Sequence, residues 1–333
     1  MFKKALGALV VASSALALIG CSVQDSPLEK SEITVYAGRS EALVQPLIEQ
    51  FQQDTGISVQ VRYAGSAELA AQLLEEGNNS PADVFFAQDA GALGAVAKAG
   101  LMVQMPAEIL GMVPSSYSAA DGSWVGVSGR VRVFNYNPER VSSVPDSVFD
   151  LAAPEWQGRV AIAPTNASFQ AFITAMRVTE GNEKTAAWLS AMKTNAVIYE
   201  KNSAILEAVE SGAVDAGLIN HYYWFARGKE VGFANMNSRI GQFRARDLGN
   251  LINAAGVGII ADSTAARSFV KFLLSETGQK YFVEETSEYP LIDGVSAGID
   301  LTPLDQVPAP EIDLSDLDDL EATLKLIRDA GLI

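Results

Sequence analysis

The chain has 333 residues, with 24 Lys and Arg against 40 Asp and Glu, so its formal net charge at pH 7 is −16. An acidic surface of this size repels nucleic acid and anionic membranes, which argues against both as binding partners and weakly favours cations. The length suffices for two domains of average size, each with its own core.

The first residues have the features of a secretory signal. Two lysines precede an uncharged apolar run that is too short to span a membrane with ordinary flanks. The run ends in Leu18-Ile19-Gly20-Cys21, which resembles the lipobox of bacterial lipoproteins, and Cys21 is the only cysteine of the chain. We therefore predict a signal peptide over 1–20 and a lipidated Cys21, with 21–31 a tether to a bacterial membrane. An ordinary signal peptide before an unrelated cysteine is the alternative.

Strands and helices alternate over the first part of the body. The pattern predicts strands at 33–37, 57–61 and 82–86, and helices that begin after Ser40, at Ser66 and at Ala90. Such alternation is typical of an α/β fold with a parallel sheet, in which ligands bind beyond the carboxyl ends of the strands. The loops at 38–40 and 87–89 are therefore expected to be walls of a cleft.

Two long extended runs, at 125–138 and 251–260, predict strands that cross between two lobes and form a hinge. On this interpretation 32–130 is the first lobe, 131–250 is the second, and 251–302 returns to the first. The last segment, 303–333, is expected to place a helix on the second lobe, with Ser315 to Asp318 as its cap and Leu317, Leu320, Leu324 and Ile327 as its apolar face.

Within the second lobe, a strand at 159–164 leads into Asn166, Ala167 and Ser168, where a helix begins. Free amides at a helix start can bind an anion, and the same residues also form an ordinary N-cap. The residues alone do not decide between these readings.

Two adjacent tyrosines, Tyr222 and Tyr223, follow the apolar run 216–219. A phenol has a pKa of about 10, so a phenolate forms at neutral pH only beside a strongly cationic group such as a hard trivalent metal. Ferric iron is the candidate metal. On spacing alone, the alternative is a pair of rim or core aromatics with hydroxyls in water.

Several segments together are similar to the periplasmic ferric-ion-binding proteins that supply iron ABC importers. The segments are Ile33-Thr34-Val35-Tyr36-x-Gly38, Ser80-Pro81-Ala82-Asp83-Val84-Phe85, Gly100-Leu101, Ser128-Gly129-Arg130, Lys201-Asn202-Ser203, Ile219-Asn220-His221-Tyr222-Tyr223-Trp224 and Glu288-Tyr289-Pro290-Leu291. The resemblance implies a two-lobed periplasmic-binding-protein fold, type II-like, and a monomeric extracytoplasmic protein that passes iron, free or chelated, to an ABC permease. Motifs of hydrolases and P-loop enzymes are absent from the sequence, so we expect no enzymatic activity.

The resemblance also implies a ligand set. Tyr222 and Tyr223 match the paired tyrosine ligands, and Tyr136 stands where a third tyrosine is expected. Other family members add a histidine and a carboxylate from the first lobe, but this chain has Ser40 and Gln88 there, with Asp89 only a substitute for the carboxylate. The site therefore resembles the three-tyrosine subtype.

Three phenolates would neutralise Fe(III) and leave coordination positions for a synergistic carbonate or phosphate. The segment that corresponds to the family's anion pocket is Asn166, Ala167 and Ser168, with Asn202 and Asn220 opposite. Arg130, Arg132 or Arg39 could add cationic donors to the anion, although a structural ion pair is the commoner role of an arginine. We interpret His221, the only histidine, as a wall residue. The rival functions are binding of an anion or a polyamine without metal, and a lipid-anchored enzyme.

Overall fold

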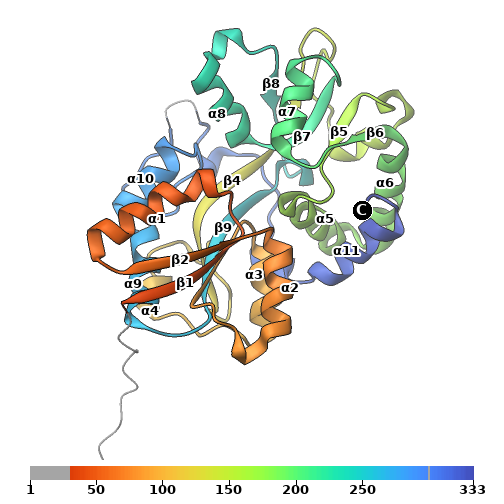
Figure 1. Cartoon of the computed structure of the whole chain (residues 1–333). Coiled ribbons are helices and arrows are strands. Elements are labelled where there is room, and N and C mark those ends of the chain that lie inside the picture. Colours follow the sequence, from red (N-terminus) through yellow and green to blue (C-terminus); the bar gives the residue numbers. More distant parts are fainter. Residues whose placement is uncertain (1–30, 299–300) are drawn as a thin grey trace, which may run out of the picture.

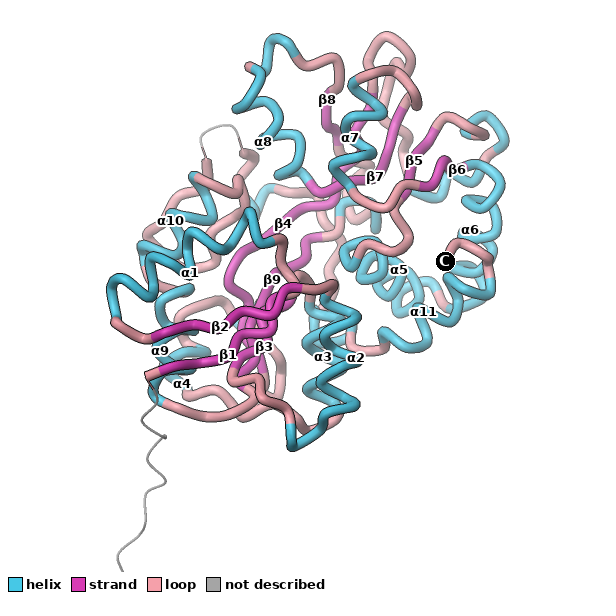
Figure 2. Tube along the Cα trace, in the orientation of Figure 1, coloured by secondary structure: helices cyan, strands magenta, loops and turns pink. Residues whose placement is uncertain are grey.

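The computed structural model describes residues 31–298 and 301–333. The predicted signal peptide, the lipidation at Cys21 and all but the last residue of the tether lie outside the described residues. No helix within the described ranges is long and apolar enough to cross a membrane. The fold is α/β, with two lobes that share one curved sheet (Figures 1 and 2).

The first lobe contains the parallel strands predicted from the sequence. These are β1 (Glu32–Ala37), β2 (Ser58–Tyr63) and β3 (Val84–Ala87), with β1 between the other two. The helices of this lobe are α1 (Glu41–Thr55), α2 (Ser66–Glu76), α3 (Ala90–Lys98), the short α4 (Ala107–Leu110), α9 (Thr264–Leu273) and α10 (Glu276–Glu284). Each of α1, α2 and α3 begins where a parallel strand has ended, as expected of a βαβ arrangement.

The second lobe repeats this plan. Its strands β5 (Val160–Ile162), β6 (Ala196–Ile198) and β7 (Ala216–Asn220) are parallel, and β8 (Arg239–Gly241) is added at one side. Its helices are α5 (Ala167–Glu180), α6 (Asn182–Asn195), α7 (Asn202–Glu210) and α8 (His221–Val231). The carboxyl ends of β5, β6 and β7 therefore lie at one edge.

Two antiparallel strands connect the lobes, which confirms the predicted hinge. Strand β4 (Trp124–Tyr136) pairs with β9 (Ile252–Ile259) up to Val131, and from Arg132 onward it pairs with β7 of the second lobe. Figure 1 shows both strands running between the lobes. Because β4 pairs with β9 up to Val131 and with β7 of the second lobe beyond it, a side chain near position 131 lies at the junction of the two lobes.

Helix α1 begins after Ser40, as predicted, and Ser40 occupies the N-cap position without a side-chain capping hydrogen bond. The predicted cap of the C-terminal helix is wrong. The C-terminal helix is interrupted: a 3₁₀ turn (Leu314–Leu317) comes first, and α11 (Leu320–Asp329) begins only after Asp319. The break occurs because the carboxylate of Asp319 accepts the N–H of Ala322 and also binds Arg177, so Asp319 acts as the N-cap.

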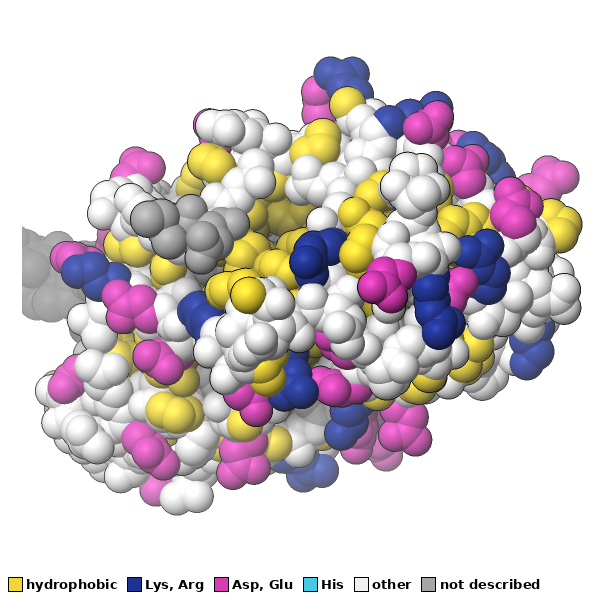
Figure 3. All heavy atoms as spheres, turned by 90° about the horizontal axis from the view of Figure 1, so that it is seen from above, with side chains coloured by type: hydrophobic (Ala, Val, Ile, Leu, Met, Phe, Trp, Pro, Cys, Tyr) yellow, Lys and Arg dark blue, Asp and Glu magenta, His cyan; other side chains and the backbone are white. Residues whose placement is uncertain are grey.

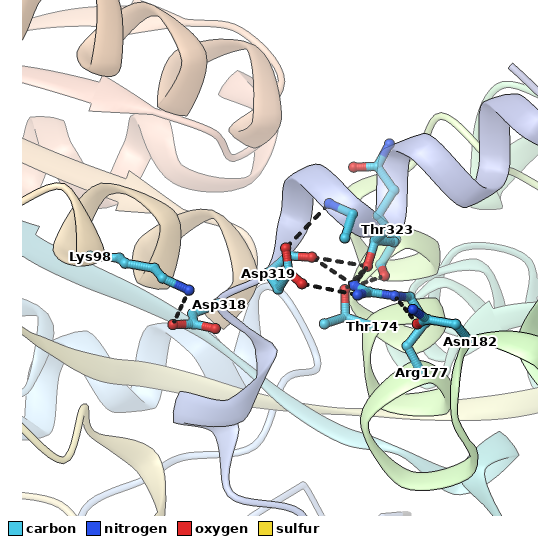
Figure 4. A network of polar contacts seen from close by, with 9 residues as sticks. Lys98, Thr174, Arg177, Asn182, Asp318, Asp319 and Thr323 are labelled. Carbon is cyan, nitrogen blue, oxygen red and sulfur yellow. Dashed lines mark hydrogen bonds and ion pairs between the residues drawn. The ribbon is translucent and has the colours of Figure 1, made fainter.

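The segment 314–329, called the C-terminal strap below, contacts both lobes (Figure 4). On the second lobe, Arg177 of α5 binds Asp319 at 2.9 Å and donates to Thr323. On the first lobe, Asp318 forms an ion pair with Lys98 of α3 at 3.5 Å. The strap is therefore a third connection between the lobes, in addition to β4 and β9.

We expect Gly94→Ala to lower the stability of the protein by about 1–3 kcal/mol, because α3 approaches the strap too closely for a side chain. A Cβ at Gly94 would lie 2.6 Å from Cβ and 2.9 Å from Cα of Asp318. Urea unfolding of Gly94→Ala measures the effect. Gly65→Ala is the matched control, since its Cβ would meet nothing closer than 4.0 Å. Equal midpoints for the two variants would contradict the close contact.

Candidate metal centre

The tyrosine pair occupies the first turn of α8, directly after β7 ends at Asn220. The rings of Tyr222 and Tyr223 are stacked, with centroids 4.3 Å apart and planes at 30°. Tyr222 is only 3% exposed. The two phenol side chains therefore extend from adjacent residues at the N-terminus of a helix, where the helix dipole favours negative charge.

Burial raises the pKa of Tyr223 well above 10, and the neighbouring phenol of Tyr222 raises it further. The charges of Arg39 and Arg130 lower this pKa, but the net shift is upward. At neutral pH Tyr223 is therefore a neutral phenol in the metal-free protein. It becomes a phenolate only when a stronger cation binds to its oxygen.

Arg39, from the loop after β1, forms a buried ion pair with Glu288. The two side chains make a bidentate contact at 3.0 and 2.7 Å. Glu288 is fully buried and also accepts hydrogen bonds from Ser128 and Thr286. Burial acts to raise the pKa of Glu288, but the Arg39 guanidinium lowers it below the usual value. Glu288 was not predicted as a site residue, since no local pattern links residues 249 positions apart.

Arg130 and Arg132 lie two residues apart on β4, and both are buried, at 1% and 2% exposure. No nitrogen of the Arg130 side chain has a hydrogen-bond partner among the described residues. Arg132 donates to the carbonyl of Ser168 at 3.3 Å and lies over the ring of Phe172, but two of its nitrogens also have no partner. Burial lowers the pKa of Arg130, and it lowers the pKa of Arg132 to about 9. Guanidinium groups stay protonated in proteins at neutral pH, so both side chains are cations.

The predicted anion segment lies at the start of α5. The Asn166 side chain accepts from the N–H of Ser168 at 3.0 Å, so it is the N-cap of this helix. Asn202, at the start of α7, donates to the Ser168 hydroxyl at 3.3 Å, and its carbonyl oxygen has no partner within the described chain. Arg132, not Arg130, contacts this helix start directly. The structure thus brings Ser168, Asn202 and a guanidinium together.

Tyr136 does not join the tyrosine pair. In the β4–β7 register Arg132 is opposite Asn220, whereas Tyr136 is opposite Ala216 at the other end of β7. At a rise of about 3.3 Å per residue, Tyr136 is about 13 Å further along the strand than Arg132. Its ring stacks on Phe134. The structure therefore does not support Tyr136 as a third ligand, because a strand of this length carries it away from the cleft.

The first lobe offers no clear metal ligand at the expected positions. Asp89 is 2% exposed, with one carboxylate oxygen capping α3 through the N–H of Ala92 and the other without a partner among the described residues. Burial raises its pKa in spite of the nearby Arg130. The Gln88 side-chain nitrogen likewise has no partner. In the described ranges no group of three or more His, Cys, Asp and Glu could hold a metal ion.

His221 is buried, and both of its ring nitrogens form hydrogen bonds. Nδ1 accepts the N–H of Val131 in the hinge strand at 3.1 Å, so Nε2 carries the proton and donates to the carbonyl of Ser287 at 2.9 Å. Burial lowers the pKa of His221 to about 4. This neutral ring therefore connects α8, the hinge and the segment that carries Glu288, and it is not free to bind metal.

We expect the metal-free protein to lose stability between pH 7 and pH 5, by about 2 kcal/mol from His221 alone. The folded pKa of about 4 is below the ordinary histidine value of 6.5, so the unfolded chain binds the proton first as pH falls. Urea unfolding at the two pH values measures the loss. His221→Gln should be less stable at pH 7, but its free energy of unfolding should not fall between pH 7 and pH 5. If the variant loses as much stability as the parent over this range, groups other than His221 cause the loss.

A cavity of about 510 Å³ lies near α8, but it is not the tyrosine site. It is lined by Val131 and Val133 of the hinge strand, His221, and the aromatic rings of Trp224, Phe225, Phe233 and Tyr289, together with neighbouring residues of β8 and the chain near 301. Seen from above, the molecule has a hollow with mostly hydrophobic side chains around it (Figure 3). Neither tyrosine of the pair lines this cavity, so the cleft predicted from the sequence and this cavity are different places.

Residues 33–285 match the family model of bacterial extracellular solute-binding proteins. The chain is 37% identical over 307 residues to the Fe(3+)-binding periplasmic protein of Serratia marcescens, with 90% of each chain covered. It is 34% identical over 323 residues to the major ferric iron-binding protein of Neisseria meningitidis, covering 95% of this chain and 98% of that protein. The crystal structure of iron-bound HitA from Pseudomonas aeruginosa has a TM-score of 0.85 and 36% identity, covering 90% of this chain and 99% of HitA.

Proposed function

Because this chain belongs to the bacterial extracellular solute-binding proteins, and within them to the periplasmic ferric-ion-binding proteins, we propose that it binds ferric iron and delivers it for uptake by an ABC importer. It is a binding protein and not an enzyme. Its relatives are periplasmic, which supports a location outside the cytoplasm.

The observation that carries this proposal is the stacked pair Tyr222 and Tyr223, which lies just after the C-terminal end of β7. Hard oxygen ligands suit a trivalent metal, and the metal charge can ionise the Tyr223 phenol, which burial otherwise keeps neutral. Tyr222 and Tyr223 are the proposed metal ligands. Tyr136 is left out of this set because of its position in the sheet.

The proposal includes a synergistic anion beside the iron. The residues proposed for it are Asn166, Ala167, Ser168, Asn202, Asn220 and Arg130, together with Arg132, whose contact with the carbonyl of Ser168 supports its inclusion. Unpaired guanidinium nitrogens beside a helix start are suited to hold carbonate or phosphate. The contacts of Ser168 with Arg132 and Asn202 support an anion site on the second lobe, which also carries the tyrosines.

We further propose that the mature protein is a monomer attached to the membrane through a lipidated Cys21, and that it docks onto the permease of its importer. The lipobox supports the anchor. Labelling of cells with an azide-modified fatty acid, with Cys21→Ser as control, tests it; equal label on both proteins would contradict the anchor.

Iron loading followed by visible spectroscopy tests the function. Ferric iron on phenolates should produce a charge-transfer band and a red to orange colour, and its affinity should weaken as pH falls, because each phenol must lose a proton to bind. Competition with a chelator at pH 6, 7 and 8 measures this trend. A colourless protein after loading with ferric iron at every pH would overturn the proposal.

Binding of an anion without metal is the second candidate, because the buried Arg39 and Arg130 act on Tyr223 and the buried Arg132 is opposite Asn220 in the sheet. The same arginines disfavour a polyamine, which is itself cationic. Calorimetry with phosphate in the absence of iron separates the candidates. Heat from phosphate alone, with no effect of iron, would favour the anion function.

A further inference from the structure

The cavity of about 510 Å³ beside α8 lies on the other face of the hinge strand from the buried arginines. Side chains of a strand alternate between its two faces, so Arg130 and Arg132 of β4 lie on one face and Val131 and Val133 on the other. The two valines line the cavity, whereas neither arginine does. Strand β4 therefore separates this cavity from the residues proposed to hold the iron and its anion.

Aromatic rings form much of the cavity wall. The rings of Trp224, Phe225 and Phe233 contact one another, with centroids 5.2 to 6.0 Å apart. The ring of Tyr289 lies against that of His221, with centroids 4.9 Å apart, and all five rings line the cavity. Such rings favour another aromatic ring as partner, in edge or offset contact. The volume is within the range of about 300–1,000 Å³ that is typical of small-molecule sites.

The cavity wall is uncharged. Among the described residues that line it, none is Asp, Glu, Lys or Arg, and the ring of His221 is neutral because burial lowers its pKa to about 4. Two polar groups of the wall are satisfied within the protein: Trp224 Nε1 donates to the carbonyl of Ser238 at 3.3 Å, and the Tyr289 hydroxyl donates to the carbonyl of Thr302 at 2.7 Å. A charged ligand would lose its water here without gaining an ion partner, so the cavity favours an uncharged one.

The wall includes residues from both sides of the lobe junction. Trp224 belongs to α8 of the second lobe, whereas Tyr289 follows α10 of the first lobe and pairs with Gly129. His221 connects the two parts, because its ring contacts Tyr289 and its Nδ1 accepts the N–H of Val131. A change in the angle between the lobes moves these wall segments relative to each other. The shape of the cavity therefore depends on that angle.

We propose that this cavity is a second binding site, for a small uncharged molecule that carries an aromatic ring system, and that its occupancy is coupled to iron binding. The wall rings contact the rings of the ligand, and the side-chain amide of Gln242, which also lines the cavity, is a hydrogen-bonding partner for a polar group on it. The ligand site is independent of the proposed function. Only the coupling rests on it, because it requires iron at Tyr222 and Tyr223, on the same helix as Trp224.

Titration of the metal-free protein with N-phenyl-1-naphthylamine tests the site, since this uncharged aromatic dye fluoresces more strongly in an apolar environment. We expect saturable binding of about one dye per chain. The sulfonate derivative of the same dye, anilinonaphthalene sulfonate, should bind at least about tenfold more weakly, because its charge finds no partner in the wall. The absence of saturable binding by the uncharged dye, or equal affinity for the two dyes, would overturn the proposal.

A variant that fills the cavity tests where the dye binds. Val133 is buried and lines the cavity, so the ring in Val133→Phe occupies space that the dye requires, and the dye affinity should fall by at least about tenfold. Val178→Phe is the matched control, since it makes the same change on α5 at a side chain that is 50% exposed. Urea unfolding shows whether each variant folds, and Gln242→Trp takes the place of Val133→Phe if that variant does not. Unchanged dye affinity in a folded variant of the cavity would contradict the site.

Chelator competition for iron, with and without a saturating amount of the dye, tests the coupling. Coupling is reciprocal, so a ligand whose affinity depends on bound iron changes the iron affinity by the same factor. We expect a change of at least about threefold in the parent protein and none in Val133→Phe. An iron affinity that the dye leaves unchanged would overturn the coupling. Failure of the parent protein to bind iron with or without dye would instead overturn the proposed function, and the dye titration would still decide the site.

Discussion

Replacement of either Tyr222 or Tyr223 by phenylalanine is expected to remove most ferric iron binding while the fold is retained. Each change deletes one ligand oxygen and keeps the stacked ring, whose centroid lies 4.3 Å from its neighbour. The affinity should fall by more than about a hundredfold, which is the upper range for loss of a residue that only supports a ligand. Chelator competition measures the affinity, and the charge-transfer band should weaken in parallel.

Tyr136→Phe is the matched control, since it makes the same chemical change on a tyrosine whose strand position is far from the pair. It should retain the band and the affinity. Loss of the band in Tyr136→Phe would restore the three-tyrosine site that the resemblance implied. Retention of full affinity in both Tyr222→Phe and Tyr223→Phe would refute the phenolate site.

The second large effect concerns Arg39 and Arg130, whose replacement by methionine should change the stability of the metal-free protein in opposite directions. Arg130→Met is expected to stabilise the metal-free protein by about 1–4 kcal/mol, because it removes a buried cation that has no hydrogen-bond partner among the described residues. Arg39→Met should destabilise it by about 3–5 kcal/mol, because it leaves the fully buried Glu288 unpaired. Thermal or urea unfolding of the metal-free proteins measures both changes.

The same variant, Arg130→Met, is also expected to change iron binding, which iron loading measures. Arg130→Met should weaken iron binding in the presence of phosphate or citrate, because the anion loses a charged donor. Without an added anion the same variant should bind iron no worse than the parent, because a repelling cation has been removed. If Arg130→Met destabilises the metal-free protein and leaves loading unchanged, Arg130 is a structural residue and not part of the anion site.

These opposite effects have one physical origin. Charge is buried in this cleft at a cost to stability, and the cost is offset only when a partner of opposite sign is present. Arg39 has that partner within the chain, in Glu288. Arg130 has none that it contacts directly in the described residues, so its partner is expected to arrive with the cargo.

Local sequence patterns predicted most of the framework. Alternating strands and helices, the long run that became β4 and the apolar run that became β9 were all identifiable, because periodicity and β-branched composition are properties of neighbouring residues. The pattern did not predict the start of the C-terminal helix correctly. Its apolar positions indicated one continuous helix from Leu317, but α11 begins only after Asp319. That break depends on Arg177, which is 142 residues away in the sequence.

The sequence by itself determined the chemistry that the protein has available: an adjacent pair of phenols after a buried strand, arginines at alternate positions of another, and Ser40 and Gln88 where the resemblance implied a histidine and a carboxylate. Only the tertiary structure decided which of these groups meet. It separated Tyr136 from the pair through the register of β4 and β7, and it joined Arg39 to Glu288 across 249 positions. The physical reason is that a residue type fixes charge and donor atoms, whereas register and burial are set by contacts between distant segments, which a local pattern does not contain.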